Sequence, residues 1–273
     1  MGAAGAGLAT LIARIVSAGV LLVFIHRKQY PVRIERLLSY KPNPRIIRQI
    51  THIGVPNGLE NTLFQFGRLL TQTLVATMGT SVIAANSVGL TISGYQYMTG
   101  TTCSTVMIVV VGRCIGAQKL EQAKYYSRKI LAINYGLLWT VILGSLIFLG
   151  PLVGMYDLSE ASAELSKTLI IWHFIIAAMI WPLGFMLPSS FRAAGDVRFP
   201  MVISIASMWI FRIALAYFFA LDSISVFGLF TIPGLGLGIM GVWGAMFVDW
   251  VFRCSVFLIH YLRGKWLKKR LVS

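Results

Sequence analysis

Charge is scarce in this sequence of 273 residues: 12% of the residues are charged, and only 9 are Asp or Glu. A soluble domain typically has about a quarter of its residues charged. By contrast, 57% of the residues are hydrophobic, and the mean hydropathy is +0.76. Successive runs of roughly 20 apolar residues are needed for bilayer crossings but not for a soluble core. The composition therefore excludes a soluble domain and predicts an all-α integral membrane protein.

Cysteine is also rare, and its placement excludes two further classes. Cys103, Cys114 and Cys254 are scattered in or beside apolar segments. They form neither a metal-binding spacing nor a disulfide framework. We interpret them as small buried hydrophobic residues.

The few acids do not form the pair that a membrane-embedded enzyme would need. An acyl or prenyl transferase requires paired acids or a His/Asp couple at the membrane surface, and the sequence has no such cluster. Asp157, Glu160 and Glu164 come nearest, and they are more simply explained as solvated loop charge. We therefore predict that the protein is not an enzyme and has no cofactor.

Apolar runs predict seven crossings. They cover residues 8–25, 50–77, 82–111, 130–150, 168–190, 200–221 and 239–262. Most of the 24 basic residues fall in alternate connections, whereas the opposite connections are mainly acidic. Cytoplasmic loops accumulate Lys and Arg, so the C-terminus is predicted to be cytoplasmic and the N-terminus to lie on the outer side of the plasma membrane. The net charge of +15 then marks topology and contact with lipid headgroups, not binding of nucleic acid.

An internal similarity predicts two repeats. Residues 1–14 align without gaps on residues 240–253, with identities at Met1/Met240, Gly2/Gly241, Gly5/Gly244, Ala6/Ala245 and Arg14/Arg253. Repeats of this spacing build transporters from two bundles around a central site. We expect residues 1–26 to be the last helix of a first repeat whose other five crossings are missing, 27–49 to be a cytoplasmic linker, 50–262 to be a second six-helix bundle, and 263–273 to be a basic cytoplasmic tail.

Two acids fall well inside apolar runs, and the first, Glu60, borders a polar stripe. A charged side chain at mid-bilayer costs about 2.5–3.5 kcal/mol on insertion scales. Helical spacing aligns the stripe residues on one face. They are Asn57, Asn61, Gln65, Arg68 and Gln72. This pattern predicts a water-filled cavity in which Glu60 binds Na⁺ or H⁺, so that ion flow is coupled to substrate movement. The alternative is that Glu60 and Arg68 are structural groups paired with other helices.

The second acid, Asp249, has Arg253 one helical turn away, which predicts a structural ion pair. In the crossing at 82–111, Asn86, Ser93 and Tyr97 fall near one face. They predict either a pocket for a flat organic cation or close helix packing. We expect His173 to lie at an interface or to be a satisfied histidine, not a ligand.

Several stretches resemble one family. IGVPNGLENTLFQFGRLLTQTLVATMGTSVIAANSVG resembles the start of the second half of multidrug and toxic compound extrusion (MATE) transporters. GRCIGAQKLEQAKYYSRKIL, FRAAGDVRFPM, GVWGAMFVDWVFR and GAAGAGLATLIAR resemble later connections, the twelfth helix and the sixth helix. The resemblance implies two six-helix bundles in a V shape that export organic cations or other toxic compounds against inflow of Na⁺ or H⁺.

By position, Glu60 matches the seventh-helix carboxylate implicated in cation coupling in part of this family. The tenth-helix segment, IIWHFIIAAMIWPLGFML, departs from some Na⁺-coupled members because it has no acid. A flippase for lipid-linked sugars, from the same superfamily, is the alternative. Its cavity should be more cationic, and only Arg68, Arg212 and Arg253 are available for that role.

Overall fold

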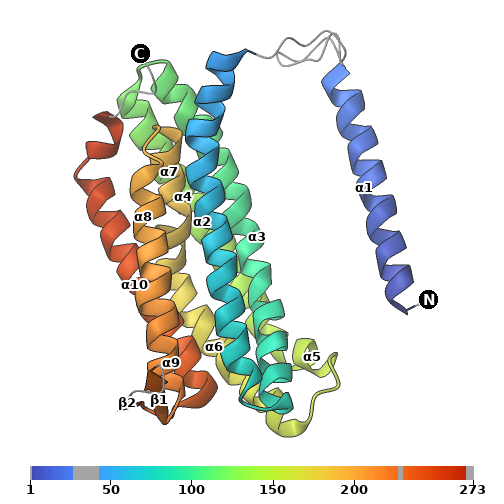
Figure 1. The fold of residues 1–273 in the computed structure, drawn as a ribbon. Helices are drawn as coiled ribbons and strands as arrows, with labels where there is room; N and C mark the ends of the chain where they lie inside the picture. Colours follow the sequence, from blue (N-terminus) through green and yellow to red (C-terminus); the bar gives the residue numbers. More distant parts are fainter. Residues whose placement is uncertain (1, 27–42, 227–229, 269–273) are drawn as a thin grey trace. The chain divides into compact units, whose positions relative to one another are not determined.

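The computed structural model describes residues 2–26, 43–226 and 230–268. The chain divides into two compact units, Met1–Thr51 and His52–Ser273. The first unit contains helix α1 (Gly2–His26) and the first turns of α2 (Pro44–Ala76) (Figure 1). The second unit contains the rest of α2 and all later elements, and the candidate site lies within it.

The second unit is a helical bundle with one small hairpin (Figure 1). The remaining long helices are α3 (Thr80–Gly116), α4 (Leu120–Ile147), α6 (Glu160–Trp181) and α10 (Gly238–Leu262). The shorter elements are α5 (Leu149–Gly154), α7 (Pro188–Ala193), α8 (Arg198–Ser207), α9 (Leu215–Ala220), the π-helical segments η1 (Pro182–Met186) and η2 (Met208–Ala214), and the 3₁₀ turn η3 (Lys265–Lys268). Strands β1 (Ser223–Val226) and β2 (Phe230–Pro233) pair antiparallel between α9 and α10.

The prediction of an all-α membrane protein is confirmed, apart from that hairpin. Two predicted crossings are composite: one is α6 continued by η1 and α7, and another is α8 continued by η2 and α9. Six helical stretches among the described residues are long and apolar enough to cross a membrane. They are Gly7–Phe24, Thr80–Gly116, Leu120–Ile147, Glu160–Ala193, Arg198–Ala220 and Gly238–Leu262.

Helix α2 is the exception among the seven predicted crossings. It is long enough at 33 residues, but it is not among the six apolar stretches because its polar side chains lower its hydropathy. It begins at Pro44, six residues before the predicted start at 50, so the end of the predicted linker is helical. The rest of that linker, residues 27–42, and the last five residues of the predicted tail lie outside the described part of the chain.

Large aromatic side chains fill the middle of the second unit, and small residues opposite them allow close helix packing. Trp181, Trp243 and Trp250 belong to one buried cluster. At the crossing of α9 and α10, a Cβ atom on Gly241 would lie 2.6 Å from the carbonyl carbon and oxygen of Phe219. Backbone atoms cannot rotate aside as a side chain can, so glycine is needed there.

Gly241→Ala is therefore expected to destabilise the protein by about 2–3 kcal/mol, as overpacking of a tight core does. Thermal unfolding of the purified protein in detergent would measure this as a lowered midpoint. The matched control is Gly136→Ala in α4, where no heavy atom lies within 4 Å of the added Cβ. An alanine there should leave the midpoint unchanged or raise it. Equal midpoints for the two variants would contradict the packing argument.

Candidate functional site, the polar face of helix α2

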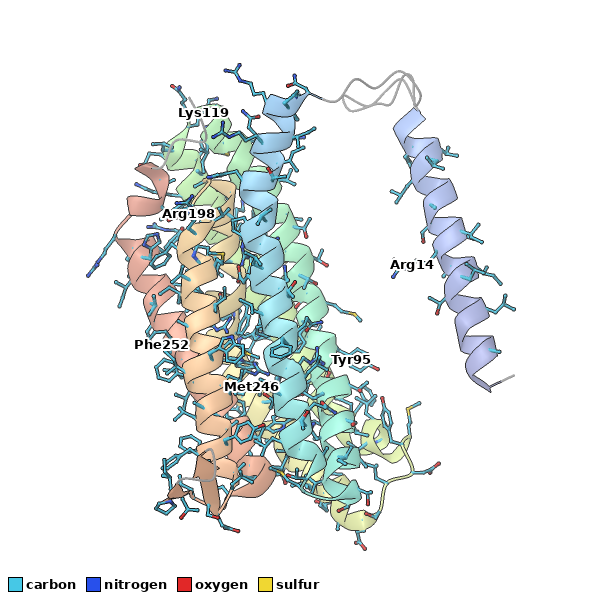
Figure 2. All side chains as sticks on the ribbon, in the orientation of Figure 1. Arg14, Tyr95, Lys119, Arg198, Met246 and Phe252 are labelled. Atoms are coloured by element: carbon cyan, nitrogen blue, oxygen red, sulfur yellow. The ribbon has the colours of Figure 1, made fainter. Side chains whose placement is uncertain are left out.

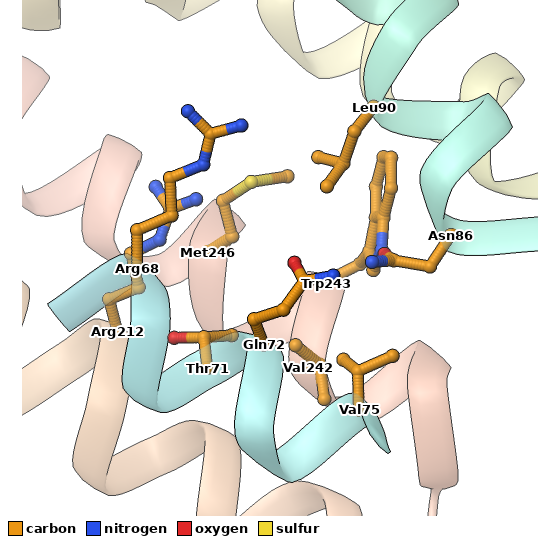
Figure 3. A pocket seen from close by; sticks show the side chains of 10 residues that line it. All are labelled: Arg68, Thr71, Gln72, Val75, Asn86, Leu90, Arg212, Val242, Trp243 and Met246. Carbon is orange, nitrogen blue, oxygen red and sulfur yellow. The ribbon is translucent and has the colours of Figure 1, made fainter. Parts of the chain in front are cut away.

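Part of the predicted stripe on α2 lines two neighbouring hollows of the second unit. Gln65, Arg68 and Gln72 line one of them together with Leu69. The other, which we call the arginine pocket, lies between α2, α3, η2 and α10 (Figure 3). Its walls are Arg68, Thr71, Gln72, Val75, Asn86, Leu90, Arg212, Val242, Trp243 and Met246. The second half of the stripe thus borders two hollows, and a water-filled cavity that couples ion flow to transport stays a prediction.

The first half of the stripe lies nearer the start of α2, away from the arginine pocket. Asn57 and Asn61 are exposed, and the Asn61 amide donates a hydrogen bond to the Asn57 carbonyl at 2.9 Å. These two residues line neither of the two hollows.

Glu60 forms an ion pair, as the structural alternative for it predicts. One terminal nitrogen of Arg192, in the last turn of α7, donates to both carboxylate oxygens of Glu60, at 2.8 and 2.9 Å. The Glu60 side chain is 13% exposed. Glu60 therefore does not line the arginine pocket; it links α2 to the connection between α7 and α8. The two residues are 132 positions apart in the chain, and a pair so distant leaves no local signal in the sequence.

Asp249 and Arg253 form the predicted pair within a larger buried network. Arg253 Nε lies 2.8 Å from Asp249 Oδ1, and both side chains are at most 3% exposed. Ser207 donates a hydrogen bond to the same oxygen. Arg212 Nη1 lies 3.9 Å from Asp249 Oδ2, so one carboxylate faces two guanidinium groups.

Aromatic rings cover these guanidinium groups. The central carbons of Arg212 and Arg253 each lie 5.6 Å from the centre of the Phe64 ring, and that of Arg253 lies 5.3 Å from the Phe185 ring. Guanidinium groups at this distance from a ring face gain cation–π stabilisation. From the sequence, Arg212 was a candidate only for a flippase cavity. The approach of Arg212 to Asp249 depends on packing of η2 against α10.

The predicted residues on α3 separate into one that lines the pocket and two that pack inside the bundle. Asn86 lines the arginine pocket and accepts a hydrogen bond from the indole nitrogen of Trp243 at 2.9 Å. Ser93 is fully buried. Tyr97 is half-buried, and its hydroxyl lies 3.4 Å from His173 Nε2. For Ser93 and Tyr97 the geometry is that of helix packing.

His173 was expected at an interface or as a satisfied histidine, and the structure places it fully in the core. Its Nε2 lies 2.6 Å from the amide nitrogen of Gln96, and its Nδ1 has no hydrogen-bond partner among the described residues. The rings of Trp243 and Trp250 pack edge-on against the His173 ring, with ring centres 5.5 and 5.0 Å from its centre. Of the two alternatives the interfacial one is wrong, and the satisfied one holds for Nε2 but not for Nδ1. The hydropathy of α6 does not distinguish a lipid-facing position from one inside the bundle.

Metal-ligand geometry is not evident beside Glu60. Within the described residues, no group of three or more His, Cys, Asp or Glu side chains could hold a metal ion. A Na⁺ ion at Glu60 would have to use the carboxylate with carbonyl, amide or water oxygens, which are the ligands that hard cations prefer.

Comparison with known proteins gives a consistent result. The chain is 26% identical over 280 residues to "Probable multidrug resistance protein NorM" of Thermotoga maritima, covering 100% of this chain and 56% of that protein. It is 28% identical to the protein of the same name from Neisseria meningitidis serogroup B, covering 77% and 46%. The chain thus spans about half the length of the curated relatives it matches.

Solved structures share the fold. A multidrug resistance MATE family transporter in an outward-facing conformation matches with a TM-score of 0.74 at 21% identity, covering 97% of this chain and 57% of that one. A MOP superfamily transporter from Pyrococcus furiosus gives the same TM-score, identity and coverage. The MatE family model matches residues 56–218, which include Glu60, Arg192 and both arginines of the pocket. This match covers more than half of the sequence and confirms the resemblance: the chain is a multi-pass membrane protein of the MatE family.

Proposed function

We propose that this chain is the C-terminal half of an antiporter, together with the last helix of its N-terminal half. The antiporter would export drugs or other toxic organic compounds across the plasma membrane against inflow of Na⁺ or H⁺. The observation that carries the proposal is the MatE match over residues 56–218. Relatives named as multidrug resistance proteins support it, and so does their greater length. The partner of this half would be a first six-helix bundle, and the two would enclose the substrate between them.

The proposed orientation places the basic end of the second unit in the cytoplasm. Lys119 and Arg198, in two different connections, lie at the same end of that unit (Figure 2). Arg192 belongs to the second of these connections. The Glu60–Arg192 pair would then lie on the cytoplasmic side of the bilayer centre, where an ion arriving from outside would be released. A cation that neutralises Glu60 would compete directly with Arg192.

A lipid-linked oligosaccharide flippase is the second candidate, and one observation favours it. Such a substrate carries a pyrophosphate, and Arg68 and Arg212 line the same pocket. Guanidinium groups are well suited to hold phosphate oxygens.

Transport by the full-length protein in proteoliposomes would test the proposal. With an inward Na⁺ or pH gradient, fluorescent dyes and drugs should leave the vesicles against their own concentration gradient. Collapse of the ion gradient should stop this movement. A fluorescent lipid-linked oligosaccharide that changes leaflet without any gradient would support the flippase instead. If neither class moved in vesicles that hold folded protein, both candidates would be rejected.

A further inference from the structure

We propose that the arginine pocket binds an amphipathic organic anion, with Arg68 and Arg212 holding a carboxylate or phosphate group and Trp243, Met246 and Leu90 covering its apolar body. This inference rests on the proposed function, because the anion would be the substrate or a part of it. It reverses the charge of the organic cation that the family resemblance implies.

The positive charge of the arginine pocket favours an anionic ligand. Among the residues that the structure describes, two guanidinium groups and no carboxylate line the pocket. The two acids of the surrounding membrane helices are engaged elsewhere: Glu60 with Arg192 at 2.8 Å, and Asp249 with Arg253 at 2.8 Å. Arg212 approaches Asp249 only at 3.9 Å. Arg68 makes no hydrogen bond or ion pair within the described residues. Arg212 and Arg253 thus share the single carboxylate of Asp249, and Arg68 adds a third guanidinium group, so positive charge exceeds negative charge by two at this site.

Burial of the Arg212 side chain also favours an anionic ligand. The Arg212 side chain is only 14% exposed and lies among membrane-spanning helices. Because Arg212 shares the Asp249 carboxylate with Arg253, its charge is only partly compensated, and a second guanidinium group on the same cavity adds repulsion. Figure 3 shows Arg68 from α2 and Arg212 from η2 on one side of the pocket. A single anion between them would remove both costs and accept charge-assisted hydrogen bonds from each.

Apolar side chains also line the pocket, and Trp243 among them is held in place. The indole nitrogen of Trp243 donates to Asn86 at 2.9 Å, and the ring packs edge-on against buried His173. Its orientation is therefore set before a ligand arrives. Met246 offers a flexible thioether that adapts to different shapes, and Leu90 completes the surface. These side chains offer contact to a flat apolar body, which inorganic phosphate lacks.

An organic cation fits the pocket poorly. The guanidinium groups of Arg68 and Arg212 would repel a further positive charge, and the nearby Phe64 ring already faces Arg212 and Arg253, each at 5.6 Å. A purely structural role for Arg212 as the counter-ion of Asp249 is also incomplete. Arg253 is also a counter-ion of Asp249, at a shorter distance. A structural role for Arg212 does not explain why Arg68 lines the same pocket.

Two probes with the same naphthyl body and charges of opposite sign test the proposal: 1-naphthyl phosphate and 1-naphthylmethylammonium. Their binding to the full-length protein in nanodiscs would be measured by calorimetry, with inorganic phosphate and a short polyprenyl pyrophosphate as further probes. We expect the naphthyl phosphate to bind and the ammonium probe not to bind. Arg68→Gln and Arg212→Gln should each weaken anion binding by about tenfold or more, as loss of a charge-assisted hydrogen bond does. Arg198→Gln, an equal change of charge on an exposed helix end, should not.

The further probes identify the source of the anion. Inorganic phosphate binding as tightly as naphthyl phosphate would overturn the role of the apolar side chains, whereas preference for the polyprenyl pyrophosphate would support a lipid source. If Arg212→Gln does not fold, exposed Arg68 still carries the test. Equal binding of the ammonium probe, or unchanged anion binding by Arg68→Gln, would overturn the inference. Gradient-driven export of cations alone would overturn the inference of an anion site and leave the proposed export function intact. Anion binding without any transport would support the anion site and count against the proposed export function.

Discussion

Glu60→Gln in the full-length protein is expected to reduce ion-driven export to background, with expression and membrane insertion unchanged. The substitution keeps the size of the side chain and an oxygen that can accept from Arg192, but it removes the charge. Neither Na⁺ nor H⁺ can then compete with Arg192 for this side chain. The wild-type carboxylate alternates between pairing with Arg192 and binding the coupling ion, whereas the amide of the variant cannot. Gradient-driven export from proteoliposomes, compared at equal amounts of folded protein, measures the effect.

Two further variants separate this role from general damage. Glu164→Gln alters an exposed carboxylate that pairs with Lys167 at 2.6 Å, and it should export at the wild-type rate. Arg192→Gln removes the competitor, so half-maximal export should need less Na⁺ or H⁺. If Glu60→Gln exported normally and still followed the gradient, Glu60 would be a structural group only, which is the alternative that its ion pair also fits.

Asp249→Asn is expected to destabilise the protein by about 3–5 kcal/mol, the usual cost of removing one partner from a buried ion pair. The carboxylate faces Arg253 at 2.8 Å and Arg212 at 3.9 Å, and Asp249 is fully buried. An amide keeps the shape but leaves two guanidinium groups without a counter-charge. Thermal and denaturant unfolding in detergent micelles would show a lowered midpoint.

The double variant Asp249→Leu with Arg253→Met tests whether the cost comes from the unpaired charge. Replacing a buried pair with apolar residues of similar volume is often nearly neutral. The double variant should therefore recover part of the loss, because the unpaired charge of Arg253 is gone although Arg212 still lacks its counter-charge. Glu121→Gln, on an exposed side chain, should stay within about 0.5 kcal/mol of the wild type. A wild-type midpoint for Asp249→Asn would mean that the two arginines find other acceptors, such as the Ser204 carbonyl that Arg253 already uses at 2.9 Å.

Local patterns in the sequence predicted the parts of this structure that depend on neighbouring residues. The Asp249–Arg253 pair lies one turn apart on one helix, and the positions of the crossings follow from runs of apolar residues. Contacts between distant segments left no such pattern. The pairing of Glu60 with Arg192 and the approach of Arg212 to Asp249 both depend on how α2, α7, η2 and α10 pack. His173 shows the same limit, because hydropathy alone does not tell a core position from a lipid-facing one.

The polarity of α2 has a consequence for biosynthesis. A helix with Glu60, Arg68 and several amides gains too little from lipid to enter the bilayer readily by itself. The side chain that neutralises Glu60 is made 132 residues later. At typical synthesis rates of 5–20 residues per second, this delay is on the order of ten seconds. During that interval α2 must wait at the translocon or at the membrane surface. The order in which helices leave the translocon would then differ from their order in the chain.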